Sequence, residues 1–113
     1  EDLKMAIDKS LISGSTTMLI LRLLENKDMY GYEMIENLEK KSENIFTLKA
    51  GTLYPLLHSL EEKNYLTSYE EAVNGKMRKY YSITKEGKKY LKLKKDEWQK
   101  YQTAVSNVLC AVY

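Results

Sequence analysis

Polar side chains able to contact nucleic acid share one face of the third helix that the sequence predicts. Leu53, Leu56, Leu57 and Leu60 follow a spacing of 3, 1 and 3 and give this helix one apolar face. The opposite face carries hydrogen-bond donors, acceptors and one aromatic ring, on Lys49, Thr52, Tyr54, His58, Ser59 and Lys63. Such a mixture suits contacts with base edges and phosphates. We therefore expect this face to contact a polar ligand, with DNA as the first candidate.

Pro55 limits where this helix can begin, because a proline deep inside a helix loses a hydrogen bond at a cost of about 3 kcal/mol. We expect Thr52 to cap the helix, which places Pro55 at its third position. The free N–H groups at residues 51–54 would then form a favourable site for a phosphate.

A second candidate for nucleic-acid contact is a hairpin with a basic tip. Strand-like runs at residues 66–73 and 77–83 flank a turn that contains an Asn-Gly pair, which favours the tight type I′ geometry. Three positive charges lie at or beside the tip, on Lys76, Arg78 and Lys79. A protruding basic hairpin suits contact with the DNA backbone or minor groove. The ordinary alternative is a surface hairpin with solubilising charge.

The net charge of the chain is only +2, but the charges are unevenly distributed. Residues 76–95 contain nine Lys or Arg and one acidic residue, whereas residues 25–71 contain ten acidic and five basic residues. This distribution predicts a basic face that can point at phosphate and an acidic face that points elsewhere. For residues 88–95 taken alone, a solvated helix face is the alternative.

Few residues suit catalysis or metal binding. The single histidine, His58, has no credible nucleophile or metal partner, and the single cysteine, Cys110, cannot form an internal disulfide. The longest apolar run, residues 18–21, falls far below the roughly 20 residues of a membrane span. We expect a cytoplasmic, soluble protein that is not an enzyme and binds no metal or cofactor.

The N-terminal part of the chain predicts a core helix with an arm before it. Apart from Arg22, residues 18–24 are apolar nearly all round, so a helix capped by Thr16 or Thr17 should lie at the centre of the core. Residues 3–12 are spaced like one face of a short helix. Residues 13–15, Ser-Gly-Ser, are expected to bend this arm away from the core helix, toward something outside its own domain.

A second helix is predicted from about Gly31 to near Ser42. Its apolar stripe is formed by Tyr32, Ile35 and Leu38, and the other face is charged. The short segment that follows, residues 45–48, suits one small strand.

The last predicted helix is capped by Thr84 and continues to about residue 112, which corresponds to about 42 Å. A 4-3 heptad spacing, interrupted only by Lys94, joins Leu91, Trp98, Tyr101, Val105, Val108 and Val112. A helix with such a seam needs a partner, and we expect a second copy of the chain. The alternative, folding back on its own core, is disfavoured by the length of the helix.

Three helices followed by a two-stranded wing define the expected fold. We expect a mainly α (α+β) winged helix-turn-helix with a long C-terminal dimerisation helix. The expected divisions are an arm at the dimer interface in residues 1–14, a DNA-binding domain in residues 15–84 and the dimerisation helix in residues 85–113.

Four stretches of sequence form a specific series. They are LILRLL at 19–24 with YGYE at 30–33, GTLYP at 51–55 followed by Leu57, Leu60 and Glu61, RKYY at 78–81, and Thr84 with Gly87. Each stretch is weak alone, but in this order and spacing the chain resembles the PadR family of bacterial transcriptional regulators, from about residue 9 to residue 98.

The resemblance implies a recognition helix at about residues 50–64, a wing at residues 74–79 and a homodimer formed through the C-terminal helix. It also implies that Thr52 and Tyr54 lie at the DNA-facing start of the recognition helix and that Tyr80 contacts phosphate. Because side chains alternate along a strand, the neighbouring Tyr81 should point inward.

The single C-terminal helix resembles a smaller subfamily, whose multidrug-binding members hold flat aromatic compounds between two tryptophans at the dimer interface. Trp98 stands at the corresponding place, and Tyr101 follows it along the seam. An indole facing its symmetry mate is able to stack a planar molecule. The alternative is that Trp98 simply packs the dimer, with Tyr101 filling the space of a ligand.

These observations lead to one expected function and one alternative. We expect a homodimeric repressor that binds double-stranded DNA at a palindromic operator, with a planar aromatic small molecule as the candidate effector. The alternative is a winged helix used mainly for small-molecule sensing or for protein contacts.

Overall fold

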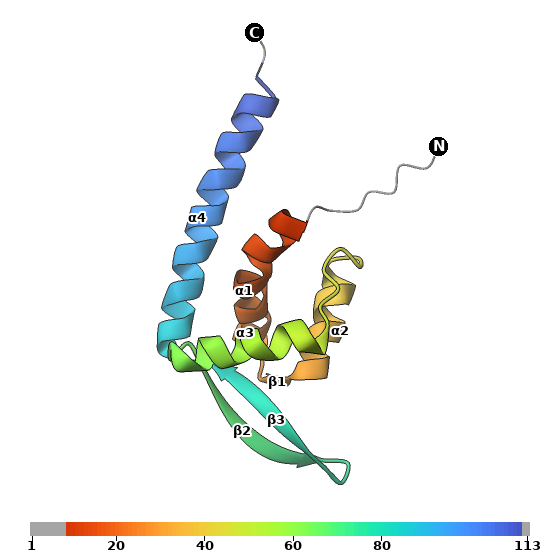
Figure 1. Ribbon diagram of the computed structural model, residues 1–113. Helices are drawn as coiled ribbons and strands as arrows, with labels where there is room; N and C mark the ends of the chain where they lie inside the picture. The colour runs from red at the N-terminus through yellow and green to blue at the C-terminus, as the bar shows by residue number, and fades with distance from the viewer. Residues whose placement is uncertain (1–8, 112–113) are drawn as a thin grey trace, which may run out of the picture.

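The computed structural model describes the backbone of residues 9–111 and the side chains of residues 15–111. This part of the chain forms four helices and a three-stranded antiparallel sheet (Figure 1). The helices are α1 (Lys9–Asn26), α2 (Gly31–Lys41), α3 (Ala50–Glu62) and α4 (Lys85–Leu109), and the strands are β1 (Met29–Tyr30), β2 (Leu66–Val73) and β3 (Lys76–Ile83). The expected winged helix with a long C-terminal helix is confirmed.

Helix α1 supplies the centre of the core, as its all-round apolar sequence predicts. Ile20, Leu21, Leu23 and Leu24 are buried. The predicted bend at residues 13–15 and the predicted cap at Thr16 or Thr17 are wrong, because α1 is continuous from Lys9. A single glycine in a helix costs only about 1 kcal/mol, which the buried apolar residues beyond it offset. Most of the predicted arm, residues 3–8, lies outside the described residues.

Helix α2 has the predicted ends but a different buried face. It begins at Gly31 and its C-cap is Ser42, and its buried residues are Gly31, Met34 and Leu38. Tyr32 is 60% exposed, so its predicted place on the inner stripe is wrong. Met34 and Leu38, four residues apart, form the buried stripe, and Tyr32 lies outside it.

The wing is the hairpin of β2 and β3, and its turn has the predicted geometry. Asn74 and Gly75 have φ angles of 50° and 79°, as a two-residue type I′ turn requires. The sheet order is β1-β3-β2, and Met29 and Tyr30 of β1 pair with Tyr81 and Tyr80. This third strand was not predicted, since two residues carry no periodicity.

The predicted strand at residues 45–48 is wrong. This segment has no strand pairing in the described structure. Phe46 and Leu48 instead pack their side chains against the core, and the Phe46 N–H donates to Ser42 Oγ at 3.0 Å. The strand that does pair with β3 on the edge away from β2 is β1, at Tyr80 and Tyr81.

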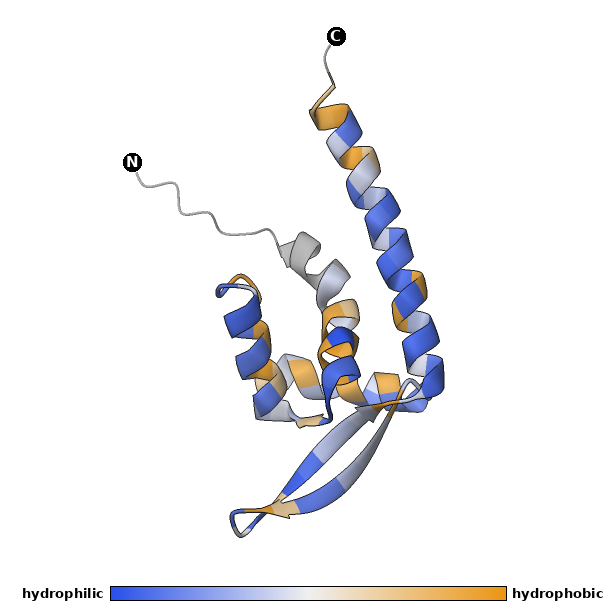
Figure 2. Cartoon of the chain, turned by 180° about the vertical axis from the view of Figure 1, so that it is seen from behind, coloured by the Kyte–Doolittle hydropathy of each residue, from blue (hydrophilic) through white to orange (hydrophobic). Residues whose placement is uncertain are grey.

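Helix α4 begins inside the core and then leaves it. Its cap is Thr84, whose hydroxyl accepts the Gly87 N–H at 2.9 Å, as the sequence predicts. Gly87 lies against the carbonyl of Tyr65, and Leu91 is completely buried. Beyond these turns the helix extends away from the body, and Figure 2 shows that apolar residues recur toward its C-terminal end.

Candidate nucleic-acid interface

Helix α3 begins two residues before the predicted cap. The carbonyl of Lys49 accepts the N–H groups of Thr52 at 3.0 Å and Leu53 at 2.9 Å, so Lys49 is the N-cap and Thr52 lies inside the helix. The predicted cap at Thr52 is therefore wrong. Pro55 falls in the second turn, where it has no N–H to donate to the carbonyl of Gly51.

The outer face of α3 carries most of the predicted contact residues. Lys49, Thr52, His58 and Lys63 are exposed, and Ser59 is half-buried. The inner face is formed by Leu53, Leu57 and Leu60, all buried, with Leu56 partly buried. Lys63 is the C-cap, so it lies at the opposite end of the helix from Lys49 and Thr52.

Tyr54 differs from the open position predicted for it. Its side chain is half-buried and packs against the core, and its ring lies so close to Gly31 that a β-carbon there would overlap it. Tyr54 therefore joins the start of α3 to the first residue of α2. Gly31 is the residue whose missing side chain permits this approach.

The basic residues of the wing differ in their surroundings. Lys76 and Lys79 are exposed, whereas Arg78 is half-buried with its guanidinium carbon 4.5 Å from the ring centre of Tyr30. Strand β2 places Glu70 opposite Lys79 and Glu71 opposite Arg78. The wing is therefore less basic than the sequence of β3 suggests.

Three tyrosines lie opposite one another across the sheet, and we call Tyr30, Tyr80 and Tyr69 the tyrosine ladder. The rings of Tyr80 and Tyr69 are stacked at 5.6 Å, and Tyr30 meets Tyr80 edge-on at 5.5 Å. Tyr80, the predicted phosphate contact, is half-buried within this ladder. Tyr81 points to the other face and is buried, as predicted.

The ladder is tied to the turn between α1 and α2. The hydroxyl of Tyr69 donates to Asp28 Oδ2 at 2.7 Å, and this hydrogen bond is the main cause that raises the pKa of Tyr69 to about 12. For Tyr80, burial is the main cause of a raised pKa. Both hydroxyls therefore stay protonated at neutral pH and remain hydrogen-bond donors.

The predicted dimer seam divides into a buried and an exposed part. Leu91 is not an interface residue, because it is completely buried in the core of its own chain. Trp98, Tyr101, Val105 and Val108 are exposed. The Lys94 ammonium pairs with Glu97 at 3.1 Å, which is the main cause of its raised pKa. Val112 lies outside the described residues.

Trp98 lines a cavity of about 400 Å³ between α1 and α4 of the same chain. The other lining residues are Ser15, Met18, Leu19 and Arg22 of α1, Phe46, and Lys95 and Gln99 of α4. Tyr101, the second predicted ligand residue, does not line it. The structure thus brings Trp98 together with α1 and Phe46 rather than with Tyr101.

Sequence reasoning missed three contributors to these sites. Tyr30 supports Arg78, Asp28 anchors the wing through Tyr69, and Phe46 closes one side of the cavity. Tyr30 was visible only as part of the YGYE stretch. Nothing in the local sequence indicates which distant side chain each residue meets.

The described residues contain neither a cluster of metal ligands nor a helix that could span a membrane. Across residues 15–111, no group of three or more potential metal ligands comes together. None of the helices in the described part of the chain is long and apolar enough to cross a membrane.

Sequence comparison finds matches of two kinds, a family model and single similar proteins. Residues 20–93 match the model of the transcriptional regulator PadR-like family. An uncharacterised protein of Lysinibacillus sphaericus is 39% identical over 93 residues, which cover 81% of this chain and 85% of that protein. The transcriptional regulator YqjI of Escherichia coli is 31% identical over 84 residues, which cover 74% of this chain but only 39% of that protein.

Solved structures agree with the sequence comparison. A transcriptional regulator from Clostridium thermocellum superposes with a TM-score of 0.80 at 37% identity, covering 87% of this chain and 96% of that one. A PadR family regulator from Eggerthella lenta gives a TM-score of 0.81 at 31% identity, covering 92% and 89%. Since the family is one of transcriptional regulators, the expectation that the protein is not an enzyme is confirmed. The chain belongs to the PadR-like family of transcriptional regulators.

Proposed function

We propose that the protein is a homodimeric, sequence-specific DNA-binding repressor whose effector is a planar aromatic molecule. The observation that carries this proposal is the placement of two polar surfaces. The N-terminal end of α3 and the tip of the wing both lie on the side of the molecule away from α4 (Figure 1). DNA can therefore reach both surfaces while α4 pairs with a second copy.

The DNA contacts divide by chemistry. Thr52 and His58 are exposed on α3 and offer hydrogen bonds to base edges, whereas Lys49, Lys76 and Lys79 offer positive charge to phosphates. In a symmetric dimer the two recognition helices would occupy successive major grooves about 34 Å apart. A palindromic operator follows from this symmetry.

The exposed seam of α4 supports the dimer. Trp98, Tyr101, Val105 and Val108 recur at intervals of three and four residues, with exposed fractions of 44%, 63%, 38% and 66%. Large apolar side chains arranged in a continuous stripe on a helix indicate a contact surface. Because a twofold axis brings the same residues of both copies together, the stripe of one copy can pack against the identical stripe of the other.

The cavity beside Trp98 supports the effector. Its walls combine the indole with Phe46, Met18 and Leu19, which suit a flat apolar ligand. Phe46 lies four residues before α3, so a ligand there would touch the segment that leads into the recognition helix. Binding could thereby change the separation of the two recognition helices.

Selection from a pool of random DNA duplexes by the full-length protein tests the DNA-binding function. We expect enrichment of a palindrome whose half-sites are one helical turn apart, or a multiple of it. A pool that shows no enrichment, from a protein confirmed to be folded and dimeric, would overturn sequence-specific binding and favour protein contacts instead.

Two single variants locate the interface on the enriched duplex. Thr52→Ala should reduce the preference for the enriched motif, whereas Lys79→Ala should weaken binding to all sequences and reduce the salt slope by about 1. The matched control is Lys100→Ala, which removes an exposed lysine from the outer part of α4. An equal effect of the control would contradict the proposed interface.

The single tryptophan provides the test of the effector. Titration with a planar aromatic dye should quench its fluorescence in the wild type and in Tyr101→Ala, but much less in Phe46→Ala. Quenching lost in Tyr101→Ala and kept in Phe46→Ala would instead place the ligand on the seam. Release of the enriched duplex by the same dye would identify it as an inducing ligand.

A further inference from the structure

The half-buried Arg78 has an incomplete set of partners. Its Nε atom is buried and, among the described residues, has no hydrogen-bond partner. No ion pair joins Arg78 to any described carboxylate, although Glu71 lies directly opposite on β2. Arginine normally meets carboxylates or phosphates through several N–H groups. The side-chain N–H groups of Arg78 therefore make no hydrogen bond or ion pair with the described residues.

The contact that holds Arg78 is the ring of Tyr30, whose centre lies 4.5 Å from the guanidinium carbon. A guanidinium lying over an aromatic ring is attracted to the ring face, while its N–H groups project in its own plane. The contact therefore fixes the charge without using the terminal N–H groups of Arg78. An external anion can bind these terminal groups, whereas the buried Nε is out of its reach.

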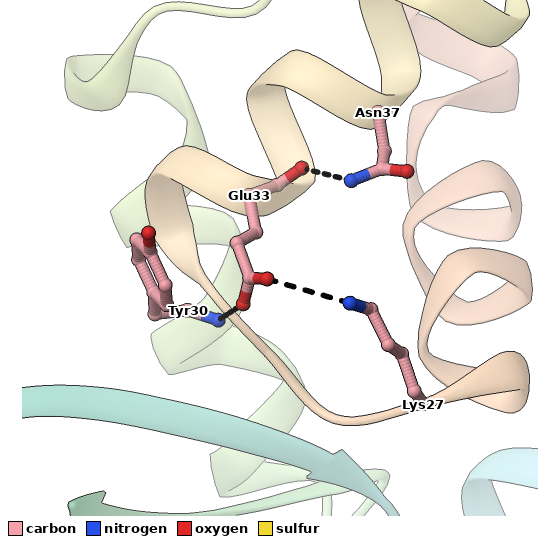
Figure 3. A network of polar contacts seen from close by, with 4 residues as sticks. All are labelled: Lys27, Tyr30, Glu33 and Asn37. Atoms are coloured by element: carbon pink, nitrogen blue, oxygen red, sulfur yellow. Dashed lines mark hydrogen bonds and ion pairs between the residues drawn. The ribbon is translucent and has the colours of Figure 1, made fainter. Parts of the chain in front are cut away.

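The place of Tyr30 is fixed by a hydrogen bond from its own backbone N–H (Figure 3). The Tyr30 N–H donates to Glu33 Oε1 at 3.2 Å, and the other oxygen of Glu33 pairs with Lys27 at 3.5 Å. The carbonyl of Glu33 accepts from Asn37 Nδ2 at 2.8 Å. Tyr30 also pairs with Tyr80 across the sheet, so it is fixed to both the wing and α2.

Tyr30 consequently connects Arg78 to the recognition helix. The residue after Tyr30 is Gly31, against which Tyr54 of α3 packs. Arg78 is thus set at a defined place relative to α3, although the two lie on different elements. A free arginine on a hairpin would lose much more side-chain entropy on binding.

We propose that Tyr30 is a positioning residue that holds the Arg78 guanidinium ready for a phosphate of the DNA backbone. This inference rests on the proposed DNA-binding function and adds the residue that orients one of its contacts. The terminal N–H groups of Arg78 supply the hydrogen bonds to the phosphate, and the ring of Tyr30 holds the guanidinium in place.

A double-mutant cycle tests this coupling on a duplex carrying the enriched motif. Arg78→Ala should lower the slope of log affinity against log salt by about 1. Tyr30→Leu should weaken binding roughly threefold to tenfold, the range of an ordinary cation–π contact. In the Arg78→Ala background, Tyr30→Leu should have no further effect. Tyr30→Phe, which keeps the ring, should restore the affinity lost in Tyr30→Leu.

A substitution at Arg78 alone tests the proposal even if Tyr30→Leu does not fold. Arg78→Lys keeps the charge but loses the planar group, so it should keep the salt slope and still lose affinity severalfold. Full affinity in Arg78→Lys would overturn the proposal even if Tyr30→Leu fails to fold.

The remaining outcomes separate this inference from the proposed function. If the wild type binds the duplex and Arg78→Ala has no effect, only the inference fails. If Tyr30→Leu weakens binding equally with and without Arg78, Tyr30 acts through the fold, and the inference again fails. A wild type that enriches no DNA would overturn the proposed function first.

Discussion

At the scale of single residues, Gly87 and Gly51 both lie in the first turn of a helix, but their surroundings differ. A β-carbon at Gly87 would overlap the carbonyl oxygen of Tyr65, whereas at Gly51 no described atom lies within 4 Å. Gly87→Ala should lower the free energy of unfolding by about 1–3 kcal/mol, the usual cost of overpacking. Gly51→Ala should leave it unchanged or raise it by up to about 1 kcal/mol. Urea denaturation measures both, and equal effects would contradict the close approach of α4 to Tyr65.

Tyr69 should make stability depend on pH in alkaline solution. Its pKa is raised from 10.0 to about 12, chiefly by its hydrogen bond to Asp28. Because the fold favours the protonated form, the contribution to stability is complete below pH 10 and is lost as the pH rises toward 12. The stability advantage of the wild type over Tyr69→Phe should therefore shrink across that window.

Denaturation at a series of pH values measures this advantage. Asp28→Asn serves as the companion variant, since it removes the charge of the acceptor while keeping the size of the side chain. It should reduce the same alkaline dependence. A stability difference between wild type and Tyr69→Phe that stays constant with pH would mean that the hydrogen bond to Asp28 does not raise the pKa of Tyr69.

At the scale of elements, strand pairing sets the charge that the wing offers to DNA. Glu70 lies opposite the exposed Lys79, so it reduces the positive potential at a predicted phosphate contact. Glu70→Gln should raise affinity for the enriched duplex roughly twofold to fivefold at low salt, with less gain at high salt. Fluorescence anisotropy at two salt concentrations measures this. The control is Glu43→Gln, just beyond α2, which should change affinity little; an equal gain would indicate a net-charge effect.

The two ends of α3 also differ at this scale. Its first turn, next to α2, carries Lys49 and Thr52, while Lys63 lies at its C-cap. A helix of 13 residues spans about 20 Å, so one DNA groove cannot approach both ends equally. We therefore expect Lys49 to contribute more to DNA affinity than Lys63.

At the scale of the whole molecule, α4 carries the surface of the proposed dimer. The helix has 25 residues, and its first turns pack in the core around Leu91, while its outer part is exposed. Val105→Glu should place a charge in the apolar seam and dissociate the proposed dimer without unfolding the winged helix. Thr103→Glu adds the same charge to the other side of the helix and should leave the dimer intact. Analytical ultracentrifugation distinguishes them, and a monomeric wild type would contradict the proposed dimer.

The sequence by itself determined those features that depend on neighbours along the chain. The bounds of α2, the Asn74-Gly75 turn, the Thr84 cap and the inward Tyr81 were all predicted, because they follow from local backbone preferences and side-chain periodicity. The series of short motifs likewise indicated the family. The resemblance placed the start of α3 correctly at about residue 50, whereas the cap that local preference predicted at Thr52 was wrong, because the N-cap, Lys49, makes no side-chain cap hydrogen bond that the sequence could signal.

Only the tertiary structure decided which distant residues meet. Leu91 continues the heptad spacing of α4 yet belongs to the core, because the first turns of that helix pack against the domain before it leaves. Trp98 lines the same cavity as Phe46, and Arg78 lies over the ring of Tyr30, across separations that no local pattern encodes. Periodicity identifies the face on which a side chain lies, whereas packing between elements chooses its neighbours. The DNA and effector contacts stay predictions, since they depend in addition on partners outside the chain.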